Sequence, residues 1–382
     1  MNLKVYLKAL TGLMLSAAFV GIVSCGEKKT ADAGEPQPML IVFASGESSV
    51  IRAGKTMEAR VGLIVNQLDV IKTQNGTVDL QTKSGSAVRI REHTEVAISK
   101  LTKKDTKVEM STGSLLATVK KESADEEFRV VTPTAIAGVR GTTFSVEVYD
   151  GKEPRVKVID GKVAMAPRIE ALEEYSAEEI EKDPALKKLS EVSESNEVVL
   201  EEEMEGTLNP EIEKEVIRIN KKLETAQSKK ESPETVLNTE EIEKNLTEAK
   251  KDKEAVSVTE SKVTPEEKSE KQTLIVIEVE AFQKIIESAD EVSLSDATNN
   301  IKEEREQKLE KILTNIEVEA SKTTLKSEDE IKEHYEKLET LIMKDGSNMT
   351  GAVIAQTDTQ LVIHTPEGVK RVEKQEVLAQ EF

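Results

Sequence analysis

The sequence predicts a multidomain β plus α chain: an all-β N-terminal domain, an acidic helical middle region and a small C-terminal β-unit. From Met39 onward, apolar and polar residues alternate, and turn residues recur about every 8 to 12 positions. Beyond Pro167, apolar residues instead recur every three or four positions within charge-rich sequence. After Asp345-Gly346 the alternation returns. We therefore expect domains at 39–168, 169–325 and 326–382.

The first 24 residues have the pattern of a signal peptide. Lys4 and Lys8 precede a stretch without charge, from Ala9 to Val23, that ends just before Cys25, the only cysteine of the chain. This stretch is short for a bilayer span and has the length of a signal-peptide core. An ordinary secretory signal with a free cysteine, or an uncleaved anchor, would also fit the pattern.

The residues around the cut, Ile22, Ser24, Cys25 and Gly26, resemble the lipobox of bacterial lipoproteins in the looser form of spirochaetal lipoproteins. The resemblance implies lipidation of Cys25, cleavage before it and acylation of the new amino terminus. Residues 25–38 are polar and contain Gly and Pro, so they are expected to form a flexible tether. We expect a lipid-anchored chain in the bacterial envelope, at the outer membrane and facing the periplasm or the surface.

The region from Met39 to Arg168 reads as an all-β unit, for which a sandwich, a barrel and a solenoid all remain open. Asp150-Gly151 and Asp160-Gly161 are hairpin signals, and the second lies between two alternating runs. The apolar positions of the clearest strands are Val78, Leu80, Val88, Ile90, Val96, Ile98, Val108 and Met110.

Several motifs in this region, in the same order, resemble the FecR domain family. The most specific are Phe128 to Ala135 (FRVVTPTA) and Val139 to Val146 (VRGTTFSV). Supporting matches are Val61-Gly62-Leu63, Leu68 to Thr73, Ser84 to Ile90 and Val158 to Val163. The resemblance implies an envelope-facing β-domain, either a short β-solenoid or a twisted β-roll. Members of the family signal to a sigma factor through a cytoplasmic segment and a membrane helix. The sequence departs from that plan, so direct sigma-factor control stays open and what we expect is the envelope-side binding module.

The rear of the chain is expected to be helical, with mobile linkers at 229–235 and 250–272, where Glu, Lys, Ser and Thr dominate. A further helix is expected at 302–316, and Ser327 is expected to cap the helix that follows it. The closing strands resemble a small Sm-like or SH3-like unit. Two apolar stripes define the other helices: Ile212, Val216, Ile219 and Leu223, and Ile275, Val279, Phe282 and Ile286.

Charge is distributed very unevenly between the two halves. Residues 39–168 contain 20 Lys and Arg against 16 Asp and Glu, whereas 169–382 contain 29 against 54, within a formal net charge of −20. An acidic surface of this size repels nucleic acid and anionic lipid headgroups. We therefore expect no nucleic-acid partner, and a membrane association made only through Cys25.

No catalytic or metal-binding pattern is evident, and we expect no enzyme activity, cofactor or metal. Ala53 to Thr56 (AGKT) resembles the end of a phosphate-binding loop, but Ser49 stands where the first glycine is needed. His93, His334 and His364 are separated in sequence and read as surface or turn residues.

Arg140-Gly141-Thr142 is the one motif with two open interpretations. Arg140 could hold a ligand carboxylate or phosphate. The alternative, which we favour, is that Gly141 supplies backbone freedom at a strand bend while Arg140 pairs locally.

The function expected from these patterns is a FecR-type ligand- or protein-binding module in envelope sensing or scaffolding. Its partner would be an unknown envelope protein or a cell-wall component. The alternative is a structural or host-interacting envelope lipoprotein without a signalling role.

Overall fold

The computed structural model describes residues 35–120, 126–139, 141–149, 153–238, 240 and 255–381. The signal peptide, Cys25, most of the tether, Arg140 and the Asp150-Gly151 turn lie outside the described residues. Within the described part, none of the helices combines the length and the apolar character needed to cross a bilayer.

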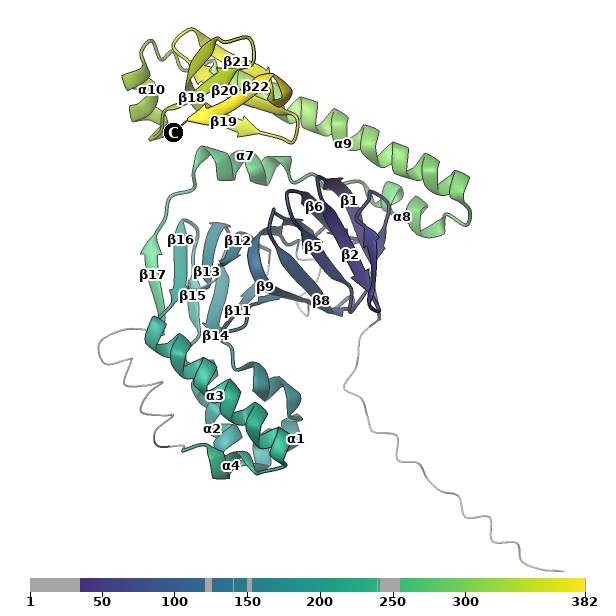
Figure 1. Cartoon of the computed structure of the whole chain (residues 1–382), viewed down its shortest axis with the longest axis vertical. Coiled ribbons are helices and arrows are strands. Elements are labelled where there is room, and N and C mark those ends of the chain that lie inside the picture. The colour runs from purple at the N-terminus through teal and green to yellow at the C-terminus, as the bar shows by residue number, and fades with distance from the viewer. Residues whose placement is uncertain are drawn as a thin grey trace, which may run out of the picture. The chain divides into compact units, whose positions relative to one another are not determined.

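Two β-sheets face each other across an apolar core (Figure 1). Each sheet contains nine strands, and β9 belongs to both. The first sheet runs β4 (Ile64–Val65), β1 (Met39–Ser45), β6 (Thr77–Thr82), β7 (Ala87–Ile90), β9 (Asp105–Thr118), β12 (Thr143–Val148), β13 (Arg155–Asp160), β16 (Met204–Leu208), β17 (Val256–Glu260). The second runs β3 (Lys55–Glu58), β2 (Ser48–Arg52), β5 (Val70–Thr73), β8 (Glu95–Leu101), β9, β10 (Glu127–Val131), β11 (Ala135–Val139), β14 (Val163–Pro167), β15 (Val198–Leu200).

Strand β9 crosses from one sheet to the other at Gly113. Its first part, up to Thr112, pairs with β8, and its second part, from Gly113, pairs with β12. Gly113 has a φ of 104°, and a Cβ placed on it would lie 2.2 Å from the Thr94 Oγ1 atom. Only glycine fits such a position without strain or a shift of the neighbouring strand. The crossing therefore depends on this residue.

The alternating pattern of the sequence is confirmed by burial. The eight apolar positions from Val78 to Met110 named above are all at most 1% exposed, and Phe144 of β12 is fully buried among them. The AGKT segment is a tight turn, because Arg52 of β2 pairs directly with Lys55 of β3. Ala53 and Gly54 both have positive φ, as a two-residue hairpin requires.

The hairpin expected at Asp160-Gly161 is wrong. Strand β13 pairs with β12 and β16, whereas β14 pairs with β11 and β15, so the turn carries the chain between sheets. Two strands joined by a short turn can leave in different sheets when the turn makes a corner. Local alternation does not distinguish this case from a hairpin.

The sheets also extend beyond the expected boundary at residue 168. Strand β15 continues the second sheet, and β16 and β17 continue the first. The β-fold thus takes in segments from 198–208 and 256–260, which the sequence pattern assigned to the acidic middle region. Short strands within highly charged sequence carry little alternation, which explains the difference.

Between β14 and β17, a group of helices adds its apolar side to the main core. Asn209 caps α3, and the predicted stripe from Ile212 to Leu223 is at most 1% exposed and confirmed. The group consists of η1 (Glu170–Glu174), α1 (Ala177–Lys182), α2 (Pro184–Ser195), α3 (Pro210–Lys229) and α4 (Pro233–Val236). The linker expected at 229–235 is therefore occupied by the end of α3 and the start of α4.

Three further helices, α7 (Pro265–Thr273), α8 (Val279–Glu287) and α9 (Glu291–Ala320), follow β17 and are called the strap here. The linker expected at 250–272 differs from the structure in its described part, where β17 and α7 lie. The stripe expected from Ile275 to Ile286 is partly wrong: Ile275 and Phe282 are buried as predicted, but Val279 and Ile286 are 46% and 37% exposed. Ile285, which was not predicted, is buried instead. The helix expected at 302–316 is the centre of the longer α9.

The C-terminal unit has α10 (Glu328–Tyr335) followed by a five-stranded sheet in the order β21, β20, β19, β18, β22. Ser327 caps α10 as expected, accepting a hydrogen bond from the Glu330 amide. His364 is not a surface residue: it is 2% exposed, and its Nδ1 atom lies 2.8 Å from the Tyr335 hydroxyl. The strands are β18 (Glu339–Met343), β19 (Asn348–Gln356), β20 (Gln360–Thr365), β21 (Gly368–Glu373) and β22 (Val377–Glu381), with η2 (Lys374–Glu376) before the last.

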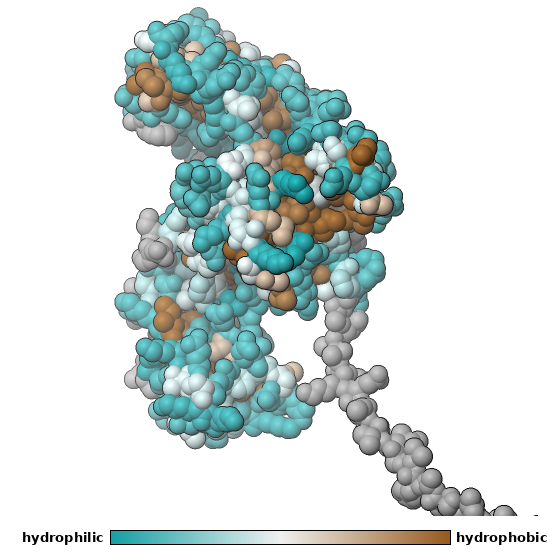
Figure 2. Space-filling model, turned by 45° about the vertical axis from the view of Figure 1, so that its right-hand side comes forward, coloured by the Kyte–Doolittle hydropathy of each residue, from teal (hydrophilic) through white to brown (hydrophobic). Residues whose placement is uncertain are grey.

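The visible face in Figure 2 is mostly hydrophilic and is interrupted by hydrophobic patches. Scattered apolar side chains are normal on protein surfaces and carry no functional message by themselves. Exposed large examples include Leu68, Val199 and Leu378.

We predict that Gly206→Ala destabilises the protein by about 1–3 kcal/mol, because the added carbon would lie 2.7 Å from Leu200 and 2.9 Å from the Met165 sulfur. Gly138→Ala is the matched control, since its nearest atom is the Ala164 carbonyl oxygen at 3.9 Å. That change should be neutral or slightly stabilising. Equal midpoints of urea unfolding for the two variants would contradict the packing of β16 on β14 and β15.

Candidate functional site

The residues Gly141 and Thr142 of the FecR-like motif form a corner between β11 of the second sheet and β12 of the first. The Thr142 hydroxyl donates to the Lys162 carbonyl at 2.7 Å and accepts from the Lys162 amide at 3.4 Å. Gly161 lies against the same corner, and a Cβ on it would lie 2.9 Å from the Gly141 carbonyl oxygen. Two crossings between the sheets are therefore packed on each other, which gives Gly141 and Thr142 a packing role.

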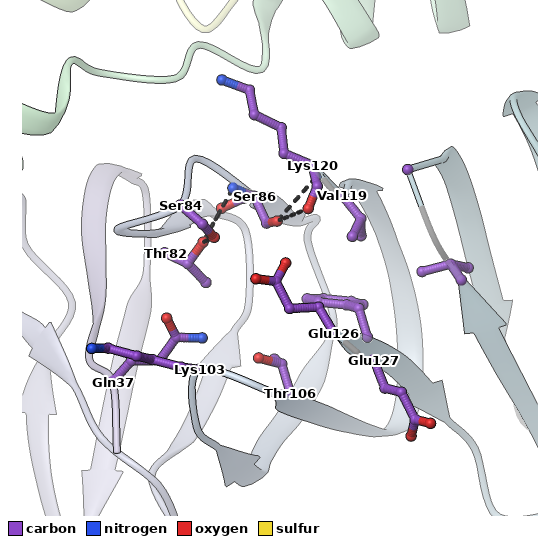
Figure 3. Close-up of a pocket in the computed structure, with 13 residues that line it drawn as sticks. Gln37, Thr82, Ser84, Ser86, Lys103, Thr106, Val119, Lys120, Glu126 and Glu127 are labelled. Atoms are coloured by element: carbon purple, nitrogen blue, oxygen red, sulfur yellow. Dashed lines mark hydrogen bonds between the residues drawn. The ribbon is translucent and has the colours of Figure 1, made fainter. Parts of the chain in front are cut away.

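A small cavity lies beside this corner (Figure 3). Ser86 joins its two sides, since its hydroxyl accepts from the Lys120 amide at 3.0 Å and lies 3.4 Å from the Lys120 carbonyl oxygen. The cavity volume is about 30 Å³, which is enough for water but not for an organic ligand.

A larger cavity, of about 430 Å³, is lined by the first sheet, the strap and the C-terminal unit. Small-molecule sites usually measure about 300–1,000 Å³. The β-sheet side contributes Arg89 and Arg91, α7 contributes Glu270 and Thr273, and α9 contributes Arg305. The C-terminal unit contributes Gln356, Thr357, Asp358 and Lys374. We call this space the charged cavity and treat it as the candidate functional site.

Arg89 fixes the strap to the first sheet. Its Nε and Nη2 atoms donate to the two oxygens of Asp79, both at 2.8 Å, and both Nη atoms donate to Thr273, at 3.1 Å to the hydroxyl and 2.9 Å to the carbonyl. Asp79 is fully buried and Arg89 is 8% exposed. Burial alone would lower the pKa of Arg89, but the charge and hydrogen bonds of Asp79 raise it above its ordinary value. This guanidinium therefore stays charged in the interior.

Arg91 makes a second bidentate contact, to Glu270 of α7, with distances of 2.8 and 2.5 Å. Burial would raise the pKa of Glu270, but the hydrogen bonds and charge of Arg91 lower it below its usual range. Gln81 adds an uncharged contact: its amide exchanges two hydrogen bonds with the Ile277 backbone, at 3.0 and 2.8 Å. The outer face of the first sheet thus holds the strap by polar groups arranged along β6 and β7.

Sequence reasoning missed this site, for a clear reason. Arg89 lies within a recognised FecR-like step, whereas Thr273, 184 positions away, falls at the edge of an expected linker. The available signal was the placement of Asp79, Gln81 and Arg89 at outward positions of otherwise apolar strands. Such residues indicate either a solvated face or a covered one, and the sequence does not distinguish between these two.

The lining of the charged cavity has charged and hydroxyl groups, and no group of three or more His, Cys, Asp or Glu side chains that could hold a metal occurs among the described residues. Among the lining residues there is no histidine or cysteine to act as a base or nucleophile beside a hydroxyl.

We predict that Asp79→Asn destabilises the protein by about 3–5 kcal/mol, because it leaves the Arg89 charge buried without its counter-ion. Glu95→Gln is the control, since Glu95 forms an exposed pair with Lys72 that contributes at most about 1 kcal/mol. Chemical unfolding of both variants measures the difference. A loss from Asp79→Asn no larger than that of the control would show that Arg89 is not held as described.

A FecR protein family model matches residues 69–164, which are 96 of the 382 residues. Among curated proteins, no match was found. Two crystal structures of a candidate anti-sigma factor from Parabacteroides distasonis resemble the chain at 20% and 19% identity, with TM-scores of 0.27 and 0.26. The matched region is 37% and 36% of this chain. It is 54% and 53% of the two compared chains, so this chain spans about half of their length. The family match thus identifies a FecR-type segment at residues 69–164.

Proposed function

We propose that this protein is a lipid-anchored envelope protein whose FecR-type domain is a binding module for sensing or scaffolding. The observation that carries the proposal is the charged cavity, which has the volume of a ligand site and is lined by the FecR-type sheet, the strap and the C-terminal unit. A site built from three segments far apart in sequence responds to anything that changes how those segments pack. This is the arrangement that a sensing module needs.

The anchor would be the acylated Cys25. Each buried methylene contributes about 0.8 kcal/mol, so three acyl chains hold a protein on a membrane almost permanently. The polar residues that follow Cys25 would act as the tether between the lipid and the β-sheets. An outer-membrane position, facing the periplasm or the surface, fits this anchor.

The acidic charge of residues 169–382 limits which partners this part of the protein can bind. With 54 acidic against 29 basic residues after position 168, it repels nucleic acid and anionic headgroups. An envelope protein or a cell-wall component is the partner that we propose. Regulation of a sigma factor is not part of the proposal.

For the fold, we propose that the FecR-type sheets form a β-roll or short solenoid and that the C-terminal unit is Sm-like or SH3-like. The second assignment is supported by five antiparallel strands in a single sheet, a preceding helix α10 and the short η2 before the last strand.

We predict that Cys25→Ser abolishes fatty-acid labelling and leaves the precursor uncleaved, because the thiol is the only acceptor of its kind in the chain. Ser24→Ala keeps a small residue before the cut and should be labelled normally. Metabolic labelling with a clickable palmitate analogue, followed by gel mobility, measures both effects. Labelling that persists in Cys25→Ser would remove the anchor from the proposal.

Cross-linking on intact cells tests the binding role. A photoreactive amino acid at Val199 of β15 or Leu378 of β22, both exposed and on different sheets, should capture defined envelope partners that mass spectrometry identifies. Capture of cell-wall material alone from both positions would instead support the structural role. Absence of any cross-link at either position would contradict both.

A further inference from the structure

The charged cavity contains two classes of ionic group. The first class is fully paired: Arg89 with Asp79, Arg91 with Glu270, and Glu266 of α7 with Lys337. These groups neutralise one another and hold the strap in place between the first sheet and the C-terminal unit. They are therefore not available to a ligand.

Arg305 of α9 belongs to the second class. Its Nε atom is buried and has no hydrogen-bond partner among the described residues. Its nearest carboxylate, on Asp358, lies 3.6 Å from the Nη2 atom, which is longer than an ordinary hydrogen bond. The guanidinium carbon lies 3.7 Å from the centre of the Phe43 ring. This stacking orients the planar group without using its donors.

Lys374 of η2 is the second cation of this class. Its ammonium makes no hydrogen bond or ion pair with another residue in the described parts of the chain. Burial lowers the pKa of Lys374, and it also lowers the pKa of Arg305. Arg305 therefore has only a long ion pair with Asp358, and Lys374 has only the more distant charges of Asp358 and Glu92.

Two carboxylates complete the second class. Asp358 lies in the loop between β19 and β20, and burial raises its pKa above the usual range. Glu92 follows β7, is exposed, and forms no ion pair with any residue that the structure describes. Around this space, Arg305 and Asp358 share one long ion pair, while Lys374 and Glu92 have no ion pair with any described residue.

We infer that the charged cavity binds a small zwitterion of the amino-acid or short-peptide class, with its carboxylate on Arg305 and Lys374 and its ammonium toward Asp358 and Glu92. The inference rests on the proposed binding role and names the ligand class of that same site. A carboxylate matches the planar donors of an arginine, and a lysine adds a third donor direction. A simple anion would satisfy the cations but would face two carboxylates, so a ligand that carries both charges fits the lining better.

The size of the cavity supports the same class. A volume of about 430 Å³ greatly exceeds that of an inorganic ion and lies in the range of organic ligands. The neutral lining groups, Thr77, Leu309, Gln356 and Thr357, leave room for a side chain or a peptide unit. Phe43 and the paired arginines hold the lining rigid, which reduces the ordering cost of binding.

The test is calorimetric titration of the full-length mature chain with the standard L-amino acids and glycylglycine. For the tightest binder, we expect the analogue that lacks the ammonium, the analogue that lacks the carboxylate, and inorganic phosphate each to bind about tenfold to a hundredfold more weakly. Equal binding of phosphate or of the carboxylate-only analogue would show a plain anion site and overturn the inference. Absence of binding by every member of the panel would overturn it as well.

Single substitutions distinguish binding in the charged cavity from binding elsewhere on the surface. Lys374→Met should weaken zwitterion binding at least about tenfold, whereas Lys370→Met, a partly exposed lysine of the same unit that pairs with Glu367, should leave it unchanged. Glu92→Gln should weaken the zwitterion but not the carboxylate-only analogue, which tests the ammonium position at a residue that forms no ion pair with Arg305. Equal effects of Lys374→Met and Lys370→Met would overturn the inference. Because the cross-linking and labelling experiments do not use this ligand, the proposed function can stand when the inference fails.

Discussion

The buried pair of Arg89 and Asp79 is the interaction on which the arrangement of this protein depends. A guanidinium and a carboxylate in the middle of a sheet face cannot remain covered unless each is satisfied, because an unpaired buried charge costs several kcal/mol. Asp79 satisfies Arg89 within the sheet, and Thr273 at the end of α7 satisfies the remaining donors. The strap is therefore positioned by a charge in the β-domain, and the C-terminal unit follows the strap.

The second constraint is the passage of the chain between the two sheets. Strand β9 belongs to both, and Gly113 provides the backbone conformation at which it changes partner. The corners at Gly141 and Gly161 make two more crossings and pack directly on each other. Repeated crossing places most apolar residues of both sheets in one core, to which the helices after β14 add their own apolar side. This continuity explains why a boundary at residue 168 does not describe the molecule.

The charged cavity is lined by two kinds of ionic group: some are tightly paired with one another, and others are less tightly paired. The paired groups, Arg89 with Asp79 and Arg91 with Glu270, hold the strap on the first sheet and make the cavity wall rigid. The less tightly paired groups, Arg305, Lys374, Asp358 and Glu92, lie on the strap, the C-terminal unit and the sheet, so that a ligand touching all of them would couple the three. A binding module of this kind can report occupancy through a change in how its parts hold together. That property suits a protein proposed to sense or scaffold at the envelope.

The sequence by itself determined the features that depend on local pattern. Alternation predicted the buried positions from Val78 to Met110, helical spacing predicted the α3 stripe, Ser327 predicted a helix start, and the ordered motifs predicted the FecR-type segment that the family match at 69–164 supports. Tertiary structure alone decided the turn at Asp160-Gly161, the added strands β15 to β17, the docking of α7 and the charged cavity. The physical reason is that an outward-facing Arg89 looks the same in sequence whether water or Thr273 satisfies it. Only the packing of residues 184 positions apart determines which of the two is present.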